Sequence, residues 1–455
     1  MTTPTAPPAP TTPKGCRHRH FQQTPRHRKK PAAKTGSLHG IKPVKETAQD
    51  IKKKVTERLK LTFVMDDWQA HMIHRIYQGY DSILLAGTGY GKSLVFQGLA
   101  AMDKQKIVVV ICPLKALERD QVAEAEAKGL RATMVNENTV SPEVWASLRQ
   151  GKDHLYYVSP EMALSDSFVS LWQDVSFRGR VQAVIVDEAH CIVDWGDDFR
   201  KEYSGLAKLR DYIGQEVPVV ACTATCTTET FNVIWTSLCF GHRPFWGADV
   251  GCERQNLAFI ICVLKNTKNP VLDALNILPD SIPKDAPSSI IPKCIFYFES
   301  VAACTTAMET IRKILPPSLR QIVQTFVALT SEAAKALLWD QFRTGTVCIL
   351  CATDAAGMGC NVPDVEYVAL FSPPRSLSVL AQRWGRAGRD RTIKSTCLLF
   401  LPEWAFRPKG LPKKTRKGKD KPLEPKISMS RRANLEKALE QFINLRSDEE
   451  NRGEN

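Results

Sequence analysis

Short apolar runs alternate with helix-like stretches from about residue 58 to residue 403, and no other feature of the chain limits its fold as strongly. Each run holds four to seven residues, most of them apolar, which is typical of strands buried within a sheet. Strands separated by helices build βαβ units and a parallel sheet. The runs are Ser82–Ala86, Ile107–Ile111, His154–Val158, Ala183–Val186, Pro218–Ala221, Leu257–Val263, Cys294–Phe298, Cys348–Cys351, Tyr367–Phe371 and Ser395–Phe400. We therefore predict an α/β fold with two doubly wound parallel-sheet lobes, over residues 58–248 and 249–403.

The basic charge of the chain is concentrated at its two ends. The net charge is +14, with 13 Lys and Arg against 2 Asp and Glu in residues 1–54, and 14 against 8 in residues 404–455. Residues 55–403 hold 35 against 38 and are therefore close to neutral. Both ends are also rich in Pro, Gly and polar residues, a composition typical of flexible segments. Flexible basic arms bind polyanions such as nucleic acids through the release of counterions.

This composition predicts two tails. We expect a disordered basic tail over residues 1–57 and a basic tail over residues 404–455. Within the second tail, apolar residues on one face of a helical repeat predict an amphipathic helix at Arg431–Arg446. The basic runs Arg26–Lys30 and Lys413–Lys421 are typical of nuclear-import signals and predict a nuclear protein. Tails that only keep the protein soluble are the alternative.

The cysteines and the hydropathy pattern bear on metal sites, compartment and membranes. Most of the 14 cysteines lie in apolar runs, including the CxxC pair Cys348 and Cys351, and no cysteine follows Cys397. This arrangement is typical of a protein from a reducing compartment and predicts that no zinc is bound. No apolar run approaches the ~18 residues of a membrane-spanning helix, and the N-terminus lacks the apolar segment of a secretory signal. We therefore expect no membrane partner.

The segment LLAGTGYGKSLVFQ, residues 84–97, combines a strand end, a glycine-rich turn and a helix start. Glycines in such a turn let successive backbone N–H groups point at a polyphosphate, and the helix N-terminus favours its negative charge. Lys92 is placed to reach the β- and γ-phosphates of ATP, and the Ser93 hydroxyl is placed to bind Mg²⁺. The predicted ATP-binding residues of the turn are Gly87, Thr88, Gly89, Tyr90, Gly91, Lys92 and Ser93.

An acidic pair, Asp187 and Glu188, directly follows the apolar run Val181–Val186. At the end of a buried strand, Asp187 is expected to hold Mg²⁺ through water, and Glu188 to orient and activate the attacking water. Such a pair on its own is often only a solvated strand cap. Together with the glycine-rich turn upstream, it predicts an NTPase core.

Several motifs occur in the order found in one group of nucleic-acid enzymes. They are CPLKALERDQV at 112–122, YVSPEMAL at 157–164, DEAH at 187–190, ACTATCT at 221–227, ILCATDAAGMGCNVPDV at 349–365 and QRWGRAGRD at 382–390. Over about residues 60–403 the chain resembles superfamily-2 helicases, and specifically the RecQ family. This resemblance implies two tandem RecA-like lobes, ATP and Mg²⁺ as cofactors, and single-stranded and duplex DNA as partners. It also implies 3′→5′ unwinding of DNA in repair, recombination or replication.

The resemblance also implies roles for individual residues. Gln69, in DDWQ before the glycine-rich turn, corresponds to the glutamine that contacts the adenine edge. Arg386 and Arg389 correspond to the arginines that face the γ-phosphate, with Arg389 as the arginine finger. The residues implied in coupling DNA binding to hydrolysis in the first lobe are His190, Thr223 and Thr225.

The stretch AHCIVDWGDDFRKEY, residues 189–203, resembles the aromatic-rich loop of the RecQ family. Its Trp195, Phe199 and Arg200 are in register with that loop, which leaves the strand that carries the acidic pair. Aromatic side chains stack on unpaired bases, so the resemblance implies that the loop reports bound DNA to the hydrolytic site. The alternative is that Trp195 and Phe199 fill a core.

The chain departs from the family pattern in both lobes. The loop has Val193, Asp197 and Lys201 where the family has Ser, His and Pro, and the second lobe has FYFES at 296–300 and FVALTSE at 326–332 in place of the usual sequences. These changes bear on how DNA binding is coupled to hydrolysis. The zinc-binding and winged-helix region that commonly follows the RecQ core is not expected here. An RNA-dependent DExH ATPase and a non-enzymatic DNA-binding adaptor are the alternative functions.

Overall fold

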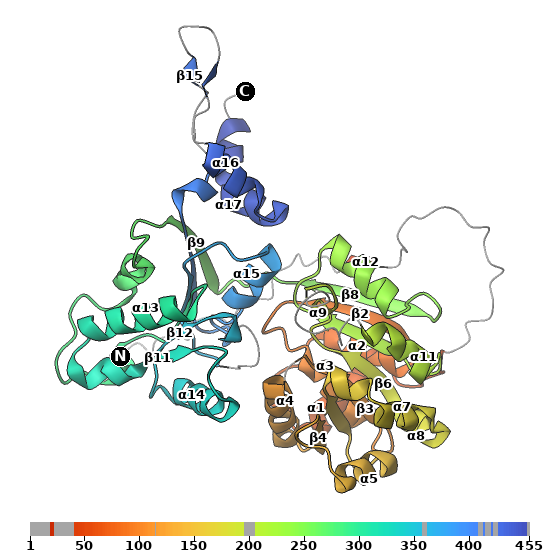
Figure 1. Ribbon diagram of the computed structural model, residues 1–455. Helices are drawn as coiled ribbons and strands as arrows, with labels where there is room; N and C mark the ends of the chain where they lie inside the picture. Colours follow the sequence, from red (N-terminus) through yellow and green to blue (C-terminus); the bar gives the residue numbers. More distant parts are fainter. Residues whose placement is uncertain are drawn as a thin grey trace, which may run out of the picture.

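The protein consists of two α/β lobes, which lie side by side in the computed structural model (Figure 1). The structure describes residues 19–21, 41–113, 115–194, 205–356, 362–407, 413–414, 420–421 and 426–452. The first lobe is built on an eight-stranded sheet and the second on a six-stranded sheet. Apart from the short edge strand β1, the strands of both sheets pair in parallel, which confirms the predicted doubly wound α/β fold.

The first sheet has the strand order β1-β8-β2-β7-β6-β3-β5-β4. Its central strands are buried on both faces because they consist largely of β-branched residues, as in IVVVI of β3 and VQAVIV of β6. Along β3, Val108 and Val110 face one apolar core, whereas Val109 and Ile111 face the other. The strands are β1 (Arg19–Phe21), β2 (Asp81–Ala86), β3 (Ile107–Ile111), β4 (Ala132–Val135), β5 (Leu155–Val158), β6 (Val181–Val186), β7 (Val219–Thr223) and β8 (Phe245–Gly251).

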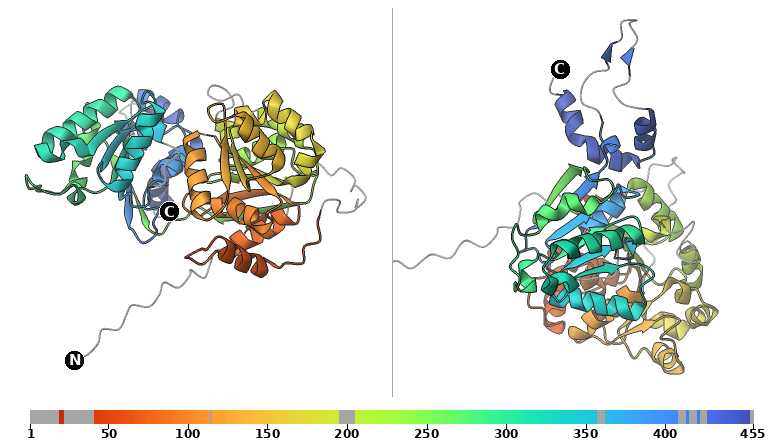
Figure 2. Two further views of the ribbon diagram at one scale, coloured as in Figure 1. Left: turned by 90° about the horizontal axis from the view of Figure 1, so that it is seen from below. Right: turned by 60° about the vertical axis from the view of Figure 1, so that its left-hand side comes forward.

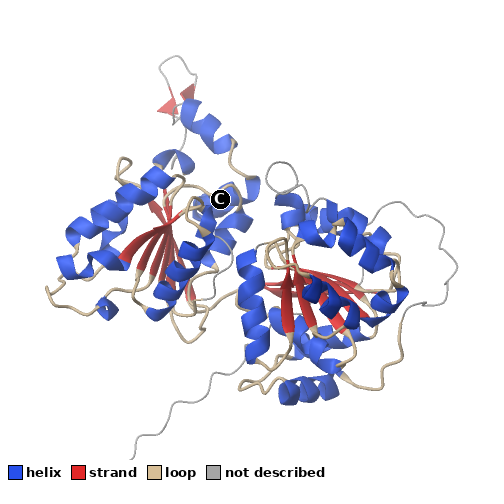
Figure 3. Ribbon diagram, turned by 60° about the horizontal axis from the view of Figure 1, so that its bottom comes forward, coloured by secondary structure: helices blue, strands red, loops and turns tan. Residues whose placement is uncertain are grey.

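Helices cover both faces of the first sheet (Figure 3). Local sequence fixes their ends, as in α5, which begins after Ser141 and ends at Gly151 in the left-handed region. The Ser141 side chain accepts a hydrogen bond from the backbone N–H of Val144. The helices are α1 (Ala48–Arg58), α2 (Asp67–Tyr77), α3 (Ser93–Met102), α4 (Lys115–Ala127), α5 (Pro142–Gln150), α6 (Pro160–Ala163), α7 (Asp166–Gln173), α8 (Val175–Arg180), α9 (Cys191–Asp194), the 3-10 helix η1 (Leu206–Lys208), α11 (Leu209–Ile213) and α12 (Thr228–Ser237).

The second sheet has the strand order β11-β12-β10-β13-β14-β9. Its two apolar cores also lie on opposite faces, with Ile295 and Tyr297 of β10 in one and Cys294 and Phe296 in the other. The strands are β9 (Leu257–Val263), β10 (Cys294–Tyr297), β11 (Val323–Phe326), β12 (Ile349–Ala352), β13 (Tyr367–Leu370) and β14 (Ser395–Leu401). The α-helices are α13 (Val301–Ile314), α14 (Glu332–Thr344) and α15 (Leu377–Trp384), and the 3-10 helices are η2 (Pro270–Ile277), η3 (Ser288–Ile290), η4 (Pro317–Ile322), η5 (Asp354–Ala356) and η6 (Glu403–Ala405).

The strand order of the first sheet places three sequence motifs next to one another. Strand β7 lies between β2 and β6, and all three are parallel. The glycine-rich turn follows β2, the threonine-rich segment begins in β7 and the acidic pair follows β6. The carboxyl ends of adjacent parallel strands meet at one edge of a sheet, which is where ligands bind in folds of this kind. The fold thus assembles at one edge groups that are far apart in the sequence.

The prediction of a tail over residues 1–57 is wrong at its C-terminal end. Helix α1 is part of the first lobe and starts with a capping box, in which Thr47 and Asp50 satisfy each other's backbone N–H groups. Its Ile51 and Val55 are fully buried in the first-lobe core. The run of lysines between them conceals this narrow apolar stripe in the sequence. Upstream of α1, strand β1 pairs with β8 of the same lobe.

The C-terminal region is also more than a tail. Helices α16 (Lys426–Ala433) and α17 (Lys437–Arg452) lie at one end of the second lobe (Figures 1 and 2). Leu439 is fully buried in the second-lobe core, and the ring of Phe442 packs edge-on against Trp384. The predicted single helix at Arg431–Arg446 is therefore corrected to two helices, because the chain turns at residues 434–436 between them. A two-stranded pair, β15 (Lys413–Lys414) and β16 (Asp420–Lys421), precedes α16.

The boundary between the lobes lies a few residues later than the predicted 248/249. Strand β8 continues in the first sheet to Gly251, and β9 starts in the second sheet at Leu257. Residues 252–256 therefore link the two lobes.

Candidate active site

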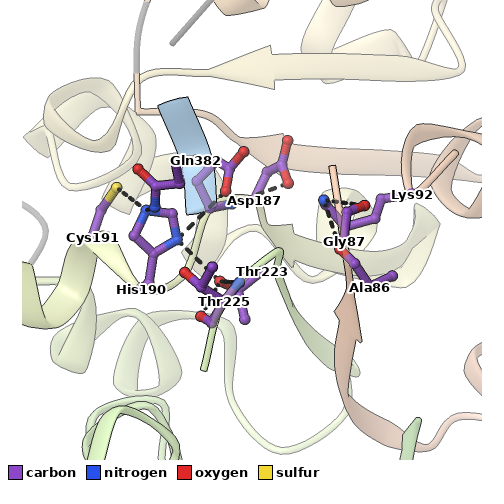
Figure 4. A network of polar contacts seen from close by, with 10 residues as sticks. Ala86, Gly87, Lys92, Asp187, His190, Cys191, Thr223, Thr225 and Gln382 are labelled. Atoms are coloured by element: carbon purple, nitrogen blue, oxygen red, sulfur yellow. Dashed lines mark hydrogen bonds and ion pairs between the residues drawn. The ribbon is translucent and has the colours of Figure 1, made fainter. Parts of the chain in front are cut away.

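The glycine-rich turn joins β2 to α3. Gly89 and Gly91 have φ angles of +81° and +77°, a conformation that residues with a side chain rarely adopt. A Cβ atom on Gly91 would also lie 2.9 Å from Nε2 of Gln69. Lys92 immediately precedes α3, and its Nζ donates to the carbonyl oxygen of Ala86 at 2.9 Å (Figure 4). The turn therefore holds the lysine ammonium group against its own backbone.

Two glutamine side chains hold the turn and the start of α3 in place. Gln69 of α2 accepts a hydrogen bond from Asp66 N at 3.0 Å and donates to Gly91 O at 3.1 Å. Gln121 of α4 donates to Ser93 Oγ at 2.9 Å. The adenine contact expected of Gln69 stays a prediction, since in this structure its amide group bonds to backbone groups of the turn and of the α2 N-terminus. Sequence reasoning missed the role of Gln121, although it lies in a motif quoted for the RecQ resemblance.

The two acids after β6 have opposite pKa shifts. Asp187 is 5% exposed, and burial together with the adjacent Glu188 carboxylate raises the pKa of Asp187 to about 7, against the charge of Lys92. Burial also acts on Glu188, but the positive charge of Lys92 lowers the pKa of Glu188. Pairs of titratable groups with divergent environments are typical of catalytic sites.

The backbone of Glu188 is strained. Its φ angle is +47°, which is uncommon for a residue with a side chain. Backbone hydrogen bonds hold this conformation, from Ala189 N to Cys222 O of β7 and from Cys191 N to Glu188 O, both at 2.9 Å. Strain of this kind clusters at functional sites, where the surrounding structure fixes it. The neighbouring strand thus fixes the turn that carries the second acid.

His190 connects the acidic pair to β7 and to the second lobe (Figure 4). Its Nδ1 lies 3.0 Å from Thr223 Oγ1 and 3.4 Å from Glu188 Oε2, and its Nε2 lies 2.7 Å from Gln382 Nε2. An amide nitrogen only donates, so His190 Nε2 accepts and the ring proton is assigned to Nδ1. Thr223 Oγ1 donates in turn to the carbonyl oxygen of Thr225 at 2.8 Å. The three predicted coupling residues therefore form one chain of hydrogen bonds, which Gln382 extends across the lobes.

Arg386 and Arg389 follow α15 of the second lobe and approach the first lobe. Their positive charges act on Glu188 and contribute to its lowered pKa. Close packing brings this segment against the glycine-rich turn, because a Cβ atom on Gly385 would lie 2.8 Å from Thr88 Oγ1. Arg386 is largely buried at this contact. The structure therefore brings the predicted arginines, the lysine of the turn and the acidic pair together.

The groups at this edge of the sheet suit a nucleoside triphosphate with Mg²⁺. Lys92 and the N-terminus of α3 offer positive charge and N–H donors for a polyphosphate. Ser93 accepts a hydrogen bond from Gln121 and keeps oxygen capacity for a cation, while Asp187 offers a carboxylate. Hydroxyl and carboxylate oxygens are ligands that Mg²⁺ prefers. A nearby cation would also favour the ionised form of Asp187, which burial disfavours here.

Part of the predicted site lies outside the described residues. This applies to Trp195, Phe199 and Arg200 of the aromatic-rich loop and to residues 357–361 of the second-lobe GMG motif. Sequence reasoning also missed a contact that the structure describes, namely the one made by Gln382. This residue begins the motif that carries the two arginines, but only the fold places it beside the DEAH histidine.

Metal-binding clusters and membrane-spanning helices are both absent from the described part of the chain. There, no three His, Cys, Asp or Glu side chains are grouped so that they could hold a metal ion. Cys348 and Cys351 are buried at β12, as the sequence predicts, and burial raises the pKa of both thiols. That the protein binds no zinc stays a prediction, which a stoichiometric zinc content in purified protein would contradict. Across the described residues, no helix is both long and apolar enough to span a bilayer.

Comparisons with known proteins match both lobes. The family of DEAD/DEAH box helicases matches residues 66–233, and the helicase conserved C-terminal domain matches residues 285–391. The solved structure of the DEAD-box helicase Mss116 bound to ssRNA and UDP-BeF has a TM-score of 0.63 at 15% identity, and the match covers 80% of this chain and 77% of that chain. This likeness supports the RecA-like fold of the two lobes.

The sequence relatives are more specific. RecQ-like DNA helicase blm-1 of Caenorhabditis elegans is 30% identical over 380 residues, which is 77% of this chain and 35% of that protein. ATP-dependent DNA helicase RecQ of Haemophilus influenzae is 30% identical over 338 residues, which is 73% of this chain and 51% of that protein. The chain thus spans about half or less of the length of these two relatives. With both helicase domains present and RecQ proteins among its relatives, the chain belongs to the DEAD/DEAH-box helicases and contains a helicase core of the RecQ type.

Proposed function

We propose that the protein is an ATP-dependent DNA helicase of the RecQ type, which moves 3′→5′ along a single strand. The observation that carries this proposal is the meeting of charged groups around Glu188: Lys92 from the glycine-rich turn, and Arg386 and Arg389 from the other lobe. Because these groups come from two lobes, ATP bound between them would link hydrolysis to lobe closure. The names of the two relatives support ATP and DNA as the nucleotide and the substrate.

In the first lobe, we assign the nucleotide chemistry to four residues. Lys92 offsets negative charge on the β- and γ-phosphates, and Ser93 and Asp187 would hold Mg²⁺, which would supply further positive charge there. Glu188 orients the attacking water and accepts its proton, in agreement with a pKa lowered by surrounding positive charge. The backbone N–H groups of the turn complete the phosphate cradle.

The second lobe completes the site only when the lobes are closed. Arg386 and Arg389 then stabilise the charge that develops on the transferred phosphoryl group. The contact between Gln382 and His190 transmits closure to Thr223 and the acidic pair. Cycles of closure and opening would let the two lobes grip a strand alternately and step along it.

The decisive experiment compares phosphate release in the presence of single-stranded DNA, single-stranded RNA and no nucleic acid. We expect stimulation by DNA, loss of turnover in Lys92→Ala, and wild-type turnover in the control Lys152→Ala, which changes an exposed lysine of the same lobe. Stronger stimulation by RNA would favour an RNA-dependent ATPase. Absence of any turnover in the wild-type protein would favour a DNA-binding adaptor.

The cellular setting is part of the same proposal. We propose a role in DNA repair, recombination or replication, and a nuclear location directed by the basic runs Arg26–Lys30 and Lys413–Lys421. Imaging of a fluorescent fusion with and without these runs tests the location. A fusion that remains nuclear after both runs are neutralised would contradict their role.

A further inference from the structure

The linker between the lobes carries a buried arginine. Arg254 lies three residues after the end of β8 and is 6% exposed. Its guanidinium group donates to both lobes: to Thr88 O of the glycine-rich turn at 3.2 Å, and to Ala387 O at 3.2 Å and Gly388 O in the second lobe. Asn256 of the same linker also donates to Gly388 O, at 2.8 Å.

The two second-lobe carbonyl groups that accept from Arg254 lie between the two arginines of the proposed ATP site. Ala387 and Gly388 are the residues that separate Arg386 from Arg389. Nη2 of Arg254 therefore donates to the peptide segment that carries both arginines. Its Nη1 donates to the turn that carries Lys92. Hydrogen bonds from a charged guanidinium group are stronger than those from a neutral donor, and its planar shape fixes their direction.

Tyr90 adds a second connection across the lobes, from within the glycine-rich turn itself. Its hydroxyl donates to Glu253 O of the linker, and the guanidinium carbon of Arg391 lies 4.7 Å from the centre of its ring. Arg391 directly follows the arginine-bearing motif of the second lobe. A guanidinium group within about 6 Å of an aromatic ring is attracted by the ring's negative face.

We propose that Arg254, Tyr90 and Arg391 form a latch between the lobes that positions Arg386 and Arg389 over the glycine-rich turn. The latch residues are positioning residues, since they act through the two arginines. The proposal rests on the proposed ATPase function and adds to it a device built from one arginine of the linker, one aromatic residue of the turn and one arginine of the second lobe. The position of the two arginines is then set by the turn's conformation.

The kinetic test removes each connection separately. Arg391→Met removes the contact with the Tyr90 ring and should lower DNA-stimulated kcat about two- to fivefold, as expected for an exposed cation–π pair. Arg254→Met removes bonds to both lobes and should lower kcat more than about tenfold, whereas Arg254→Lys should restore part of it. KM for ATP should change less than kcat, because the latch acts on the closed state in which the arginines operate.

A matched control is present in the first lobe. The guanidinium group of Arg75 lies over the Tyr80 ring at 5.3 Å, and both residues belong to the same lobe. Arg75→Met therefore removes a similar pair without affecting a contact between lobes, and should leave kcat unchanged. Equal effects of Arg75→Met and Arg391→Met on kcat would overturn the latch.

A second measurement does not depend on ATP hydrolysis. Hydrogen–deuterium exchange of the nucleotide-free protein should be faster at residues 385–391 and 87–93 in Arg254→Met and Arg391→Met than in the wild type. The strands of both sheets should exchange at the wild-type rate in these variants. Wild-type exchange in these two segments, in variants that remain folded, would overturn the latch, whatever the ATPase activity. If the two variants exchange faster than the wild type in these segments but the wild-type protein shows no ATPase activity, the latch is supported and the proposed function is overturned.

Discussion

The substitution Gln382→Met tests whether the contact between the lobes couples them. Gln382 Nε2 donates to His190 Nε2 at 2.7 Å, and His190 is 4% exposed. Removing the donor leaves the buried His190 Nε2 with only the weak thiol contact of Cys191 Sγ at 3.6 Å, which fixes the ring proton on Nδ1 less firmly, and the bond to Thr223 requires that proton. Loss of such a bond costs about 1–3 kcal/mol. If the whole cost falls on the closed state, the closed-to-open ratio drops about five- to 150-fold.

The assay is DNA-stimulated phosphate release beside a thermal melt. We expect Gln382→Met to lower the stimulated rate at least about fivefold and to keep a melting temperature close to that of the wild type, because the contact lies between lobes and not within one. The control is Gln324→Met, which removes a local bond from Gln324 Nε2 to Gln321 O at 3.0 Å within the second lobe. A stimulated rate for Gln382→Met equal to that of the control would refute the reasoning.

Three further predictions follow from other parts of the chain. Asp81 is fully buried and accepts hydrogen bonds from Arg210 at 2.7 Å and Val219 N at 2.9 Å. Asp81→Ala should therefore lower the free energy of unfolding, measured in urea, by about 3–5 kcal/mol. The control Asp67→Ala, which removes an exposed ion pair with Lys52, should lower it by less than about 1 kcal/mol. Trp195→Ala should keep basal ATP turnover but reduce its stimulation by single-stranded DNA about tenfold; full stimulation would remove the loop's sensor role. Replacing Arg26, Arg28, Lys29 and Lys30 by Gln should flatten the plot of log K against log salt by about 0.7–0.9 for each DNA phosphate that the protein no longer neutralises, and an unchanged slope would show that this run does not bind DNA.

The sequence predicts the sheet well where strands are strongly apolar. All ten apolar runs coincide with strands within a few residues, and β9 has the predicted bounds Leu257–Val263. Strands β4, β8 and β11 were not predicted, because they are short or interrupted by polar residues and glycine, as in FWGADVG of β8. Helix α1 was missed because polar and charged residues outnumber its apolar residues, although Ile51 and Val55 share one face.

The site divides in a similar way. Local motifs identify Lys92, Asp187 and Glu188, because each lies at a strand end whose neighbours are fixed by the parallel topology. The contacts between lobes were not predictable, since they depend on how two domains with separate cores dock. Gln382 and Arg254 are separated from their partners in the first lobe by more than a hundred residues, and nothing in the local sequence around either one indicates that contact.

The most direct test of the proposed function is strand displacement on two partial duplexes that differ only in the polarity of the single-stranded tail. Each substrate is incubated with the wild-type protein or with Lys92→Ala, in the presence and absence of ATP and Mg²⁺. A 3′→5′ RecQ-type helicase displaces the strand only from the duplex with a 3′ tail, only with ATP, and not in the Lys92→Ala variant. Displacement that needs no ATP, that persists in Lys92→Ala or that requires a 5′ tail would contradict this account.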